Sequence, residues 1–196
     1  MKLFLASTSP RRQELIRRLG LPVEILKNTA DETYEPEWSP EEVVQHLSKI
    51  KAQGAYTSLR ATPKGEEGIL VGADTIVAMN QTILGKPRDV THATTMLESL
   101  QGNQHKVFTG ITLIETNTGK RITTYESTDV WMKSLDRDQI ERYITTGEPM
   151  DKAGSYGIQG IGATLIHRIE GDYFNVVGLP LSKLADQLKE FGVQIP

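Results

Sequence analysis

The chain has 196 residues, with 22 Lys and Arg against 25 Asp and Glu, a formal net charge of −3 and no cysteine. A chain of this length buries roughly 70% of its unfolded surface on folding, so we expect one domain over residues 1–196. The lack of cysteine excludes thiol nucleophiles, disulfides, thiolate zinc sites and iron–sulfur clusters. The mildly acidic balance argues against duplex DNA as a partner, because DNA binding needs a basic surface, but it allows a basic pocket for a small anion.

The sequence offers no candidate for a targeting or membrane segment. The N-terminal stretch MKLFLAS has one lysine and an apolar run too short for a signal peptide. No later run approaches the roughly 20 apolar residues of a membrane span. We therefore expect a cytoplasmic protein.

The N-terminal half alternates strands with helices. A strand is predicted over residues 2–6, and a helix follows because Ser9-Pro10 supplies an N-cap and a suitable first helical residue. Ser39 and the glutamate three residues later form a capping box, which predicts a second helix ending near Ala55. The apolar run over residues 69–79 predicts a buried strand with a polar break.

The C-terminal half continues this alternation and inserts a hairpin. Helices are predicted around residues 93–100, 140–144 and 181–191, and strands over residues 107–115, 121–132, 163–169 and 172–177. The alternation with an inserted hairpin predicts an α/β fold with a mixed sheet.

The first candidate site is the segment Ser7-Thr8-Ser9-Pro10-Arg11-Arg12, between the first strand and the first helix. Backbone N–H groups at a helix start, hydroxyl groups and two guanidinium groups converge there, and such a set is suited to holding phosphate. An ordinary helix cap followed by solvated arginines is the alternative. The glycine-rich P-loop motif does not occur in the sequence.

A carboxylate inside an apolar strand marks the second candidate site. Asp74 stands in Gly72-Ala73-Asp74-Thr75, and its burial is costly unless it is paired, hydrogen-bonded or bound to a metal. Lys86 follows in Leu84-Gly85-Lys86-Pro87 and could bring a cation to the same edge. A lysine for phosphate and a carboxylate for metal or water suit phosphoryl chemistry. An aspartate that caps a turn at the strand end is the alternative.

Other charged residues carry weaker signals. Lys51 lies at the edge of the apolar stripe of the second helix, where a lysine usually only extends its head to water. Glu32, beside Asp31, belongs to an acidic stretch that is typical of a solvated loop, although one carboxylate there could help to hold Mg²⁺. The histidines show no metal-ligand spacing and are expected to be structural or exposed: His46, His92, His105 and His167.

The third candidate site is the glycine-rich stretch that begins at Asp151 and includes Gln159. Glycines let the backbone approach a ligand closely, and the Gln159 amide offers both a donor and an acceptor, as contact with the edge of a base requires. A tight structural loop is the alternative, and this stretch alone favours it.

Six segments together match one known family in its order. They are Ser7-Thr8-Ser9-Pro10-Arg11-Arg12, Gly72-Ala73-Asp74-Thr75-Ile76-Val77, Gly85-Lys86-Pro87-Arg88-Asp89, His105-Lys106-Val107-Phe108-Thr109-Gly110, Asp151-Lys152-Ala153-Gly154-Ser155-Tyr156-Gly157-Ile158-Gln159-Gly160 and Val177-Gly178-Leu179-Pro180-Leu181. Each alone is a weak signal, but six in register are specific. On these segments the chain resembles the Maf family of nucleoside triphosphate pyrophosphatases.

The resemblance implies an α/β fold with a mixed twisted sheet flanked by helices and two lobes around a deep cleft, related to the inosine triphosphate pyrophosphatases. It also implies hydrolysis of a nucleoside triphosphate to the monophosphate and pyrophosphate with a divalent metal, Mg²⁺ or Mn²⁺. Three positions distinguish the subfamilies, and Arg11, Thr75 and Gln159 here are similar to the dTTP/UTP branch. The branch acting on 7-methyl-GTP typically has Trp, Gln and Glu instead.

The resemblance also assigns roles to residues of this chain. Asp74 would accept the proton of the attacking water, and base choice would rest on Arg11, Thr75 and Gln159. The phosphate ligands would be Ser7, Arg12, Lys51 and Lys86, and the metal ligands Glu32 and Asp74. The expected partner is a small nucleoside triphosphate, namely dTTP, UTP or a modified pyrimidine nucleotide, and analogy alone allows a homodimer. The alternative function is a nucleotide- or nucleic-acid-binding regulator of septum formation and cell division, which would bind without turnover.

Overall fold

The computed structural model of the chain describes residues 1–27, 30, 32–61 and 67–195. Its strands are β1 (Leu3–Leu5), β2 (Val23–Ile25), β3 (Ile69–Met79), β4 (Thr82–Leu84), β5 (Gln104–Glu115), β6 (Arg121–Met132) and β7 (Ile166–Glu170). Its α-helices are α1 (Pro10–Arg17), α2 (Pro40–Arg60), α3 (Val90–Leu100), α4 (Arg137–Thr145), α5 (Tyr173–Val177) and α6 (Leu181–Lys189). Short 3₁₀ helices are η1 (Glu148–Asp151), η2 (Ala153–Ser155) and η3 (Gly160–Leu165). None of the helices within these described ranges has both the length and the apolar character that crossing a membrane requires.

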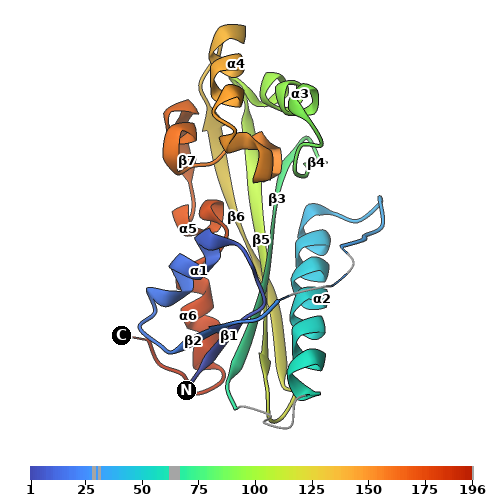
Figure 1. Cartoon of the computed structure of the whole chain (residues 1–196), viewed down its shortest axis with the longest axis vertical. Helices are drawn as coiled ribbons and strands as arrows, with labels where there is room; N and C mark the ends of the chain where they lie inside the picture. Colours follow the sequence, from blue (N-terminus) through green and yellow to red (C-terminus); the bar gives the residue numbers. More distant parts are fainter. Residues whose placement is uncertain (28–29, 31, 62–66, 196) are drawn as a thin grey trace. The chain divides into compact units, whose positions relative to one another are not determined.

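The strands form a mixed sheet. Within the described residues their order is β2-β1-β3-β5-β6-β7, with β4 paired to β3. β1 runs parallel to β2 and β3, whereas β4 is antiparallel to β3 and β7 is antiparallel to β6. Helices alternate with these strands along the chain (Figure 1). The predicted α/β class, with a mixed sheet flanked by helices, is confirmed.

The chain divides into two compact units. Unit 1 consists of Met1–Asp74, Thr109–Glu126 and Gly178–Pro196, and unit 2 of Thr75–Phe108 and Ser127–Val177. The long strands β3, β5 and β6 each contribute residues to both units. The boundary within β3 falls directly after Asp74, the carboxylate that the sequence singles out.

In unit 1, α2 packs unusually closely on the strands. The helix begins with the predicted capping box, in which the Ser39 Oγ accepts from the Glu42 N–H at 3.3 Å and the Ser39 N–H donates to Glu42 Oε2 at 2.8 Å. Glycines permit the close approach, since a Cβ on Gly72 would lie 2.6 Å from the carbonyl oxygen of Ser48, and one on Gly110 would lie 2.0 Å from another backbone oxygen of α2. Figure 1 shows α2 along one side of these strands and α1 and α6 along the other.

The predicted end of the second helix is wrong by five residues. α2 continues past Ala55 to Arg60. Its apolar face extends with it, because Leu59 is 9% exposed and packs in a core with Leu70 and Ile114. Burial of this additional turn stabilises a stretch whose local sequence carries no strong helix signal.

The predicted strand over residues 172–177 is also wrong. This stretch forms the short helix α5. Asp172 Oδ1 accepts a hydrogen bond from the Phe174 N–H at 2.7 Å, which starts a helical turn at a point where the β-branched and aromatic residues favour a strand. The preceding strand is shorter than expected, because residues 160–165 form η3 and β7 begins at Ile166.

A buried histidine lies in unit 2. His105 is 2% exposed, and its Nε2 lies 2.7 Å from the hydroxyl of Tyr156. Burial lowers the pKa of His105 to about 4, and the nearby Asp129 carboxylate opposes this shift only partly. His105 is therefore neutral in the folded protein at neutral pH, which agrees with the structural role expected from the sequence.

This histidine makes the folded protein sensitive to acid. Between its unfolded pKa near 6.5 and its folded pKa near 4, the unfolded chain binds more protons, so the free energy of unfolding falls as the pH is lowered through this window. We expect the variant His105→Gln, which keeps a polar group near Tyr156 without titrating, to lose less of its free energy of unfolding across that window. Urea unfolding at a series of pH values measures this, and parallel losses in both proteins would contradict the role of His105.

Candidate active site

The centre of the candidate site in unit 1 is a lysine held between two carboxylates. The Nζ of Lys51 donates to Asp74 Oδ1 in a short hydrogen bond and lies 3.0 Å from Glu32 Oε1. The side chains of Lys51 and Asp74 are 10% and 9% exposed, whereas that of Glu32 is 57% exposed. Asp74, the aspartate singled out from the sequence, is therefore part of a nearly buried ion pair with Lys51, and the exposed carboxylate of Glu32 lies on the other side of the lysine.

Packing of α2 on β3 brings this pair together. Gly72 and Asp74 are two residues apart in the strand, so their side-chain positions share one face. A Cβ on Gly72 would meet the backbone of Ser48 and Ala52, the residues that flank the helical turn carrying Lys51. The glycine thus lets α2 approach until the lysine reaches Asp74. The expectation that the head group of Lys51 only extends into water is wrong, because Lys51 is 8% exposed and ion-paired with Asp74.

The segment after β1 begins the helix as predicted but without the expected cap. Ser9 occupies the N-cap position of α1 and makes no capping hydrogen bond through its side chain. Ser7, which is 7% exposed, accepts instead, since its Oγ receives the Ser9 N–H at 3.2 Å. The Ser7 hydroxyl is therefore fixed beside the start of α1.

Arg12 joins the same charged group. Its Nε donates to the carbonyl oxygen of Gly178 at 2.8 Å, so the guanidinium is held by a residue far along the chain. Burial lowers the pKa of Arg12, the carboxylate of Asp74 opposes that shift, and Arg11 and Glu32 act more weakly in opposite directions. The guanidinium remains charged, because an arginine does not lose its proton in a protein. Unit 1 thus gathers two cations and two carboxylates, and the alternative of solvated arginines does not describe Arg12.

Three of the predicted site residues lie in unit 2, whereas Arg11 lies on α1 in unit 1, where it is half-buried. Thr75 follows Asp74 in β3 and is half-buried, and Lys86 is exposed after β4. Gln159 is half-buried in the glycine-rich stretch. The segment of Lys86 is joined to this stretch, because the Gly154 N–H donates to the carbonyl oxygen of Gly85 at 3.0 Å. Within unit 2 the structure therefore links the segments that carry Lys86 and Gln159.

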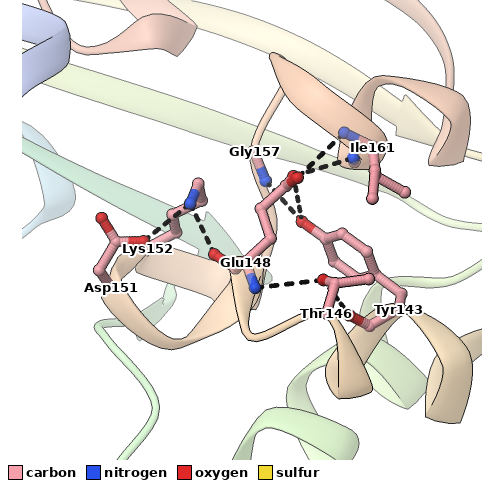
Figure 2. A network of polar contacts seen from close by, with 8 residues as sticks. Tyr143, Thr146, Glu148, Asp151, Lys152, Gly157 and Ile161 are labelled. Carbon is pink, nitrogen blue, oxygen red and sulfur yellow. Dashed lines mark hydrogen bonds and ion pairs between the residues drawn. The ribbon is translucent and has the colours of Figure 1, made fainter.

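The glycine-rich stretch is held by side chains from α4 and η1 (Figure 2). Glu148 accepts hydrogen bonds from the backbone N–H groups of Ile161 and Gly162 at 3.0 and 2.9 Å. The hydroxyl of Tyr143 donates to Glu148 at 3.0 Å and accepts from the Gly157 N–H at 3.2 Å. The loop that presents Gln159 is thus fixed at both of its ends.

A metal ion has a restricted donor set in unit 1. In the part of the chain that the structure describes, no group of three or more His, Asp or Glu side chains could hold a metal. Glu32 and Asp74 nevertheless direct oxygens to one cation, the ammonium of Lys51. Mg²⁺ is commonly held by one or two carboxylates together with phosphate oxygens and waters, so these residues fit a metal that arrives with a phosphate ligand. Asp31, the other candidate, lies outside the described residues.

The comparisons with known proteins decide the family. The family model described as Maf-like protein matches residues 2–191. The chain belongs to the Maf family. The resemblance that rested on six segments is thereby confirmed across almost the whole sequence.

Individual Maf relatives are similar over their full length. A protein named dTTP/UTP pyrophosphatase from Desulforamulus reducens is 49% identical over 193 residues, which is 98% of each chain. A protein of the same name from Thermoanaerobacter sp. strain X514 is 48% identical over 196 residues, which is 100% of each chain. A third, from Acetivibrio thermocellus, is 49% identical over 100% of this chain and 98% of its own. Among solved structures, the Ham1 protein of Staphylococcus aureus matches at 10% identity with a TM-score of 0.48, over 85% of this chain and 80% of that one.

Three contacts of this Maf-family chain are not predicted by any sequence pattern. They are the hydrogen bond from Arg12 to Gly178, the pairing of Lys51 with both carboxylates and the contacts of Glu148 with the glycine-rich loop. The segment around Gly178 is among the six that match the family, but its composition carries no sign of this contact. For Glu148 the only available signal is its position directly after Gly147, which ends the preceding helix.

Proposed function

We propose that this Maf-family protein hydrolyses dTTP and UTP to the nucleoside monophosphate and pyrophosphate. The observation that carries the proposal is the nearly buried carboxylate of Asp74, held by Lys51 within a group of charges. The relatives named dTTP/UTP pyrophosphatase, which align over whole chains, support this choice of substrates. The cytoplasm, where nucleoside triphosphates are made and used, is the proposed location.

Cations would neutralise the triphosphate. Arg12 and Lys51 in unit 1 and Lys86 in unit 2 supply positive charge, and the hydroxyl of Ser7 supplies a donor at the start of α1. Guanidinium and ammonium groups form strong charge-assisted hydrogen bonds to phosphate, and a helix start favours negative charge. These groups would hold the substrate and stabilise charge on the departing pyrophosphate.

Asp74 would accept the proton of the attacking water. Lys51 contacts Oδ1 and so fixes the carboxylate, and the second oxygen, Oδ2, would accept the proton. The oxygen of that water attacks the α-phosphorus, its proton goes to Asp74, and the bond from the α-phosphorus to the bridging oxygen of pyrophosphate breaks. A carboxylate held in this way is ready for proton transfer without reorganisation.

The proposed reaction would require a divalent cation, Mg²⁺ or Mn²⁺. Glu32 and Asp74 would hold it together with oxygens of the triphosphate. When bound, the metal would neutralise charge on the phosphate oxygens. The ammonium of Lys51 would then bind phosphate oxygen as well as Asp74.

Base choice would rest on Arg11, Thr75 and Gln159. A hydroxyl, an amide and a guanidinium offer donors and acceptors that can match the edge of a pyrimidine. A base that leaves such groups unpaired loses binding energy, so purines would be disfavoured.

A panel of nucleoside triphosphates tests the function. We expect pyrophosphate release from dTTP and UTP with a kcat/KM at least about tenfold above that of dATP or dGTP, since unpaired polar groups penalise the wrong base. Chelation of divalent metal should abolish the release. Binding without turnover in the presence of Mg²⁺ or Mn²⁺ would contradict the proposal and favour the regulatory alternative, and preference for a purine would contradict the assigned substrates.

A further inference from the structure

The carboxylate of Glu148 accepts three hydrogen bonds, two from the glycine-rich loop and one from Tyr143. Its Oε1 accepts from the hydroxyl of Tyr143 and the Gly162 N–H, and its Oε2 accepts from the Ile161 N–H (Figure 2). Each of these bonds spans 2.9 to 3.0 Å. The side chain therefore joins η1 to the first residues of η3.

These bonds satisfy donors that the loop's own N-cap residue leaves unused. The first N–H groups of a helix have no partner inside it and usually bond to the side chain at the N-cap. Gln159 is the N-cap of η3 and makes no capping hydrogen bond through its side chain. Glu148, eleven positions earlier in the chain, takes over that task for Ile161 and Gly162. The side-chain amide of Gln159 is thus not needed to cap η3.

The glycines of the loop are matched to this arrangement. A Cβ on Gly160 would lie 2.7 Å from Glu148 Oε2, and Gly160 also has a φ of +66°, a conformation that favours glycine. A Cβ on Gly162 would lie 2.6 Å from the hydroxyl of Tyr143. The glycines at these positions allow the carboxylate and the phenol to contact the backbone directly.

The carboxylate is charged in this setting. Burial raises the pKa of Glu148, but hydrogen bonds from Gly162, Ile161 and Tyr143 together outweigh it and lower the pKa below the usual value. Lys152 adds a favourable charge, and its Nζ also donates to the carbonyl oxygen of Glu148 at 2.6 Å. An ionised carboxylate accepts all three hydrogen bonds, whereas an amide cannot, because half of it is a donor.

We propose that Glu148 is a positioning residue for base selection, because it caps η3 in place of Gln159 and so leaves the Gln159 amide to the base. This inference rests on the proposed function, in which Gln159 contacts the pyrimidine. Tyr143 supports the same arrangement by fixing Glu148 and the Gly157 N–H. Without the carboxylate of Glu148, the side-chain carbonyl oxygen of Gln159 would turn to the N–H groups of Ile161 and Gly162, which would have lost their acceptor.

The variant Glu148→Gln tests the proposal, because it keeps the shape and turns one acceptor into a donor. We expect the ratio of kcat/KM for dTTP to that for dGTP to fall about tenfold, mainly through a higher KM for dTTP with kcat nearly retained. Glu141→Gln on α4, whose side chain is 57% exposed and bridges to Arg137, is the matched control and should leave the ratio unchanged. A lower melting temperature of Glu148→Gln with an unchanged ratio would show a merely structural role and overturn the proposal.

A double-mutant cycle shows whether Glu148 acts through Gln159. Gln159→Ala should lower the ratio by itself, and adding Glu148→Gln should lower it no further, because the two changes remove the same contact. Additive losses would overturn the proposal. If Glu148→Gln does not fold, Tyr143→Phe replaces it in the cycle, with a smaller expected loss in the same direction.

The unaltered protein separates the two possible failures. If it releases no pyrophosphate from any triphosphate, the proposed function fails, and the positioning role fails with it. If it is active and prefers dTTP, but Glu148→Gln keeps that preference, the inference about Glu148 alone fails.

Discussion

Replacing Asp74 by Asn is expected to reduce pyrophosphate release from dTTP by roughly 10²- to 10⁴-fold, the usual contribution of a positioned general base. The amide keeps the size of the side chain but cannot accept the proton of the attacking water. The charge of Asp74 also pairs with Lys51, so the free energy of unfolding should fall because a nearly buried ammonium loses its partner. The rate is therefore measured per folded molecule, at a temperature where circular dichroism shows the variant to be folded.

The control for Asp74→Asn is the same change on the surface. Asp186 lies on α6 with its side chain 62% exposed and bridges to Lys189. Asp186→Asn should leave both the rate and the unfolding transition nearly unchanged. A folded Asp74→Asn protein with an undiminished rate would remove Asp74 from the reaction.

Replacing Gly72 by Ala should strongly lower the free energy of unfolding. The added Cβ would lie 2.6 Å from the carbonyl oxygen of Ser48 and 2.7 Å from the backbone nitrogen of Ala52, so α2 must move away from β3. Forcing atoms into a packed core costs up to about 3 kcal/mol, and here the obstacle is backbone that cannot rotate aside. Because Lys51 lies on the displaced turn, its contact with Asp74 should be lost as well, and activity per folded molecule should fall.

Gly85→Ala provides the matched control for this prediction. A Cβ on Gly85 would meet no atom within 4 Å, so its free energy of unfolding should change by less than about 0.5 kcal/mol. Urea unfolding followed by fluorescence of the tryptophans measures both variants. Equal stabilities for Gly72→Ala and Gly85→Ala would show that α2 does not depend on the close approach at Gly72.

The predictions for Asp74 and Gly72 both concern the contact between α2 and β3. Gly72 sets how near α2 can come, that distance decides whether Lys51 reaches Asp74, and the lysine fixes the carboxylate that is proposed to take the proton. The glycine and the aspartate therefore occur together in one short motif for a physical reason. A change at either position should reduce activity, but only the change at Gly72 acts by moving a helix.

Local signals predicted most of the elements. The capping box at Ser39, the apolar run of β3 and the turn between β5 and β6 each involve residues that are close in sequence, and each is present in the structure. The short strands β2 and β4 carried too few residues for a recognisable pattern. The stretch after Gly171 was predicted as a strand but forms α5, because the hydrogen bond of the Asp172 side chain outweighs the strand preference of its neighbours.

Six segments in a fixed order are enough to identify the family from the amino-acid sequence. The absence of cysteine limits the chemistry to oxygen, nitrogen and hard-metal groups. Which of these groups contact one another depends on the packing of the folded chain. Lys51 and Asp74 are 23 positions apart and Arg12 and Gly178 are 166 apart, and neither contact follows from any local pattern. The physical reason is that periodicity and capping act over a few residues, whereas side-chain partners depend on how closely helices and strands pack, which at Gly72 is set by the absence of a single Cβ.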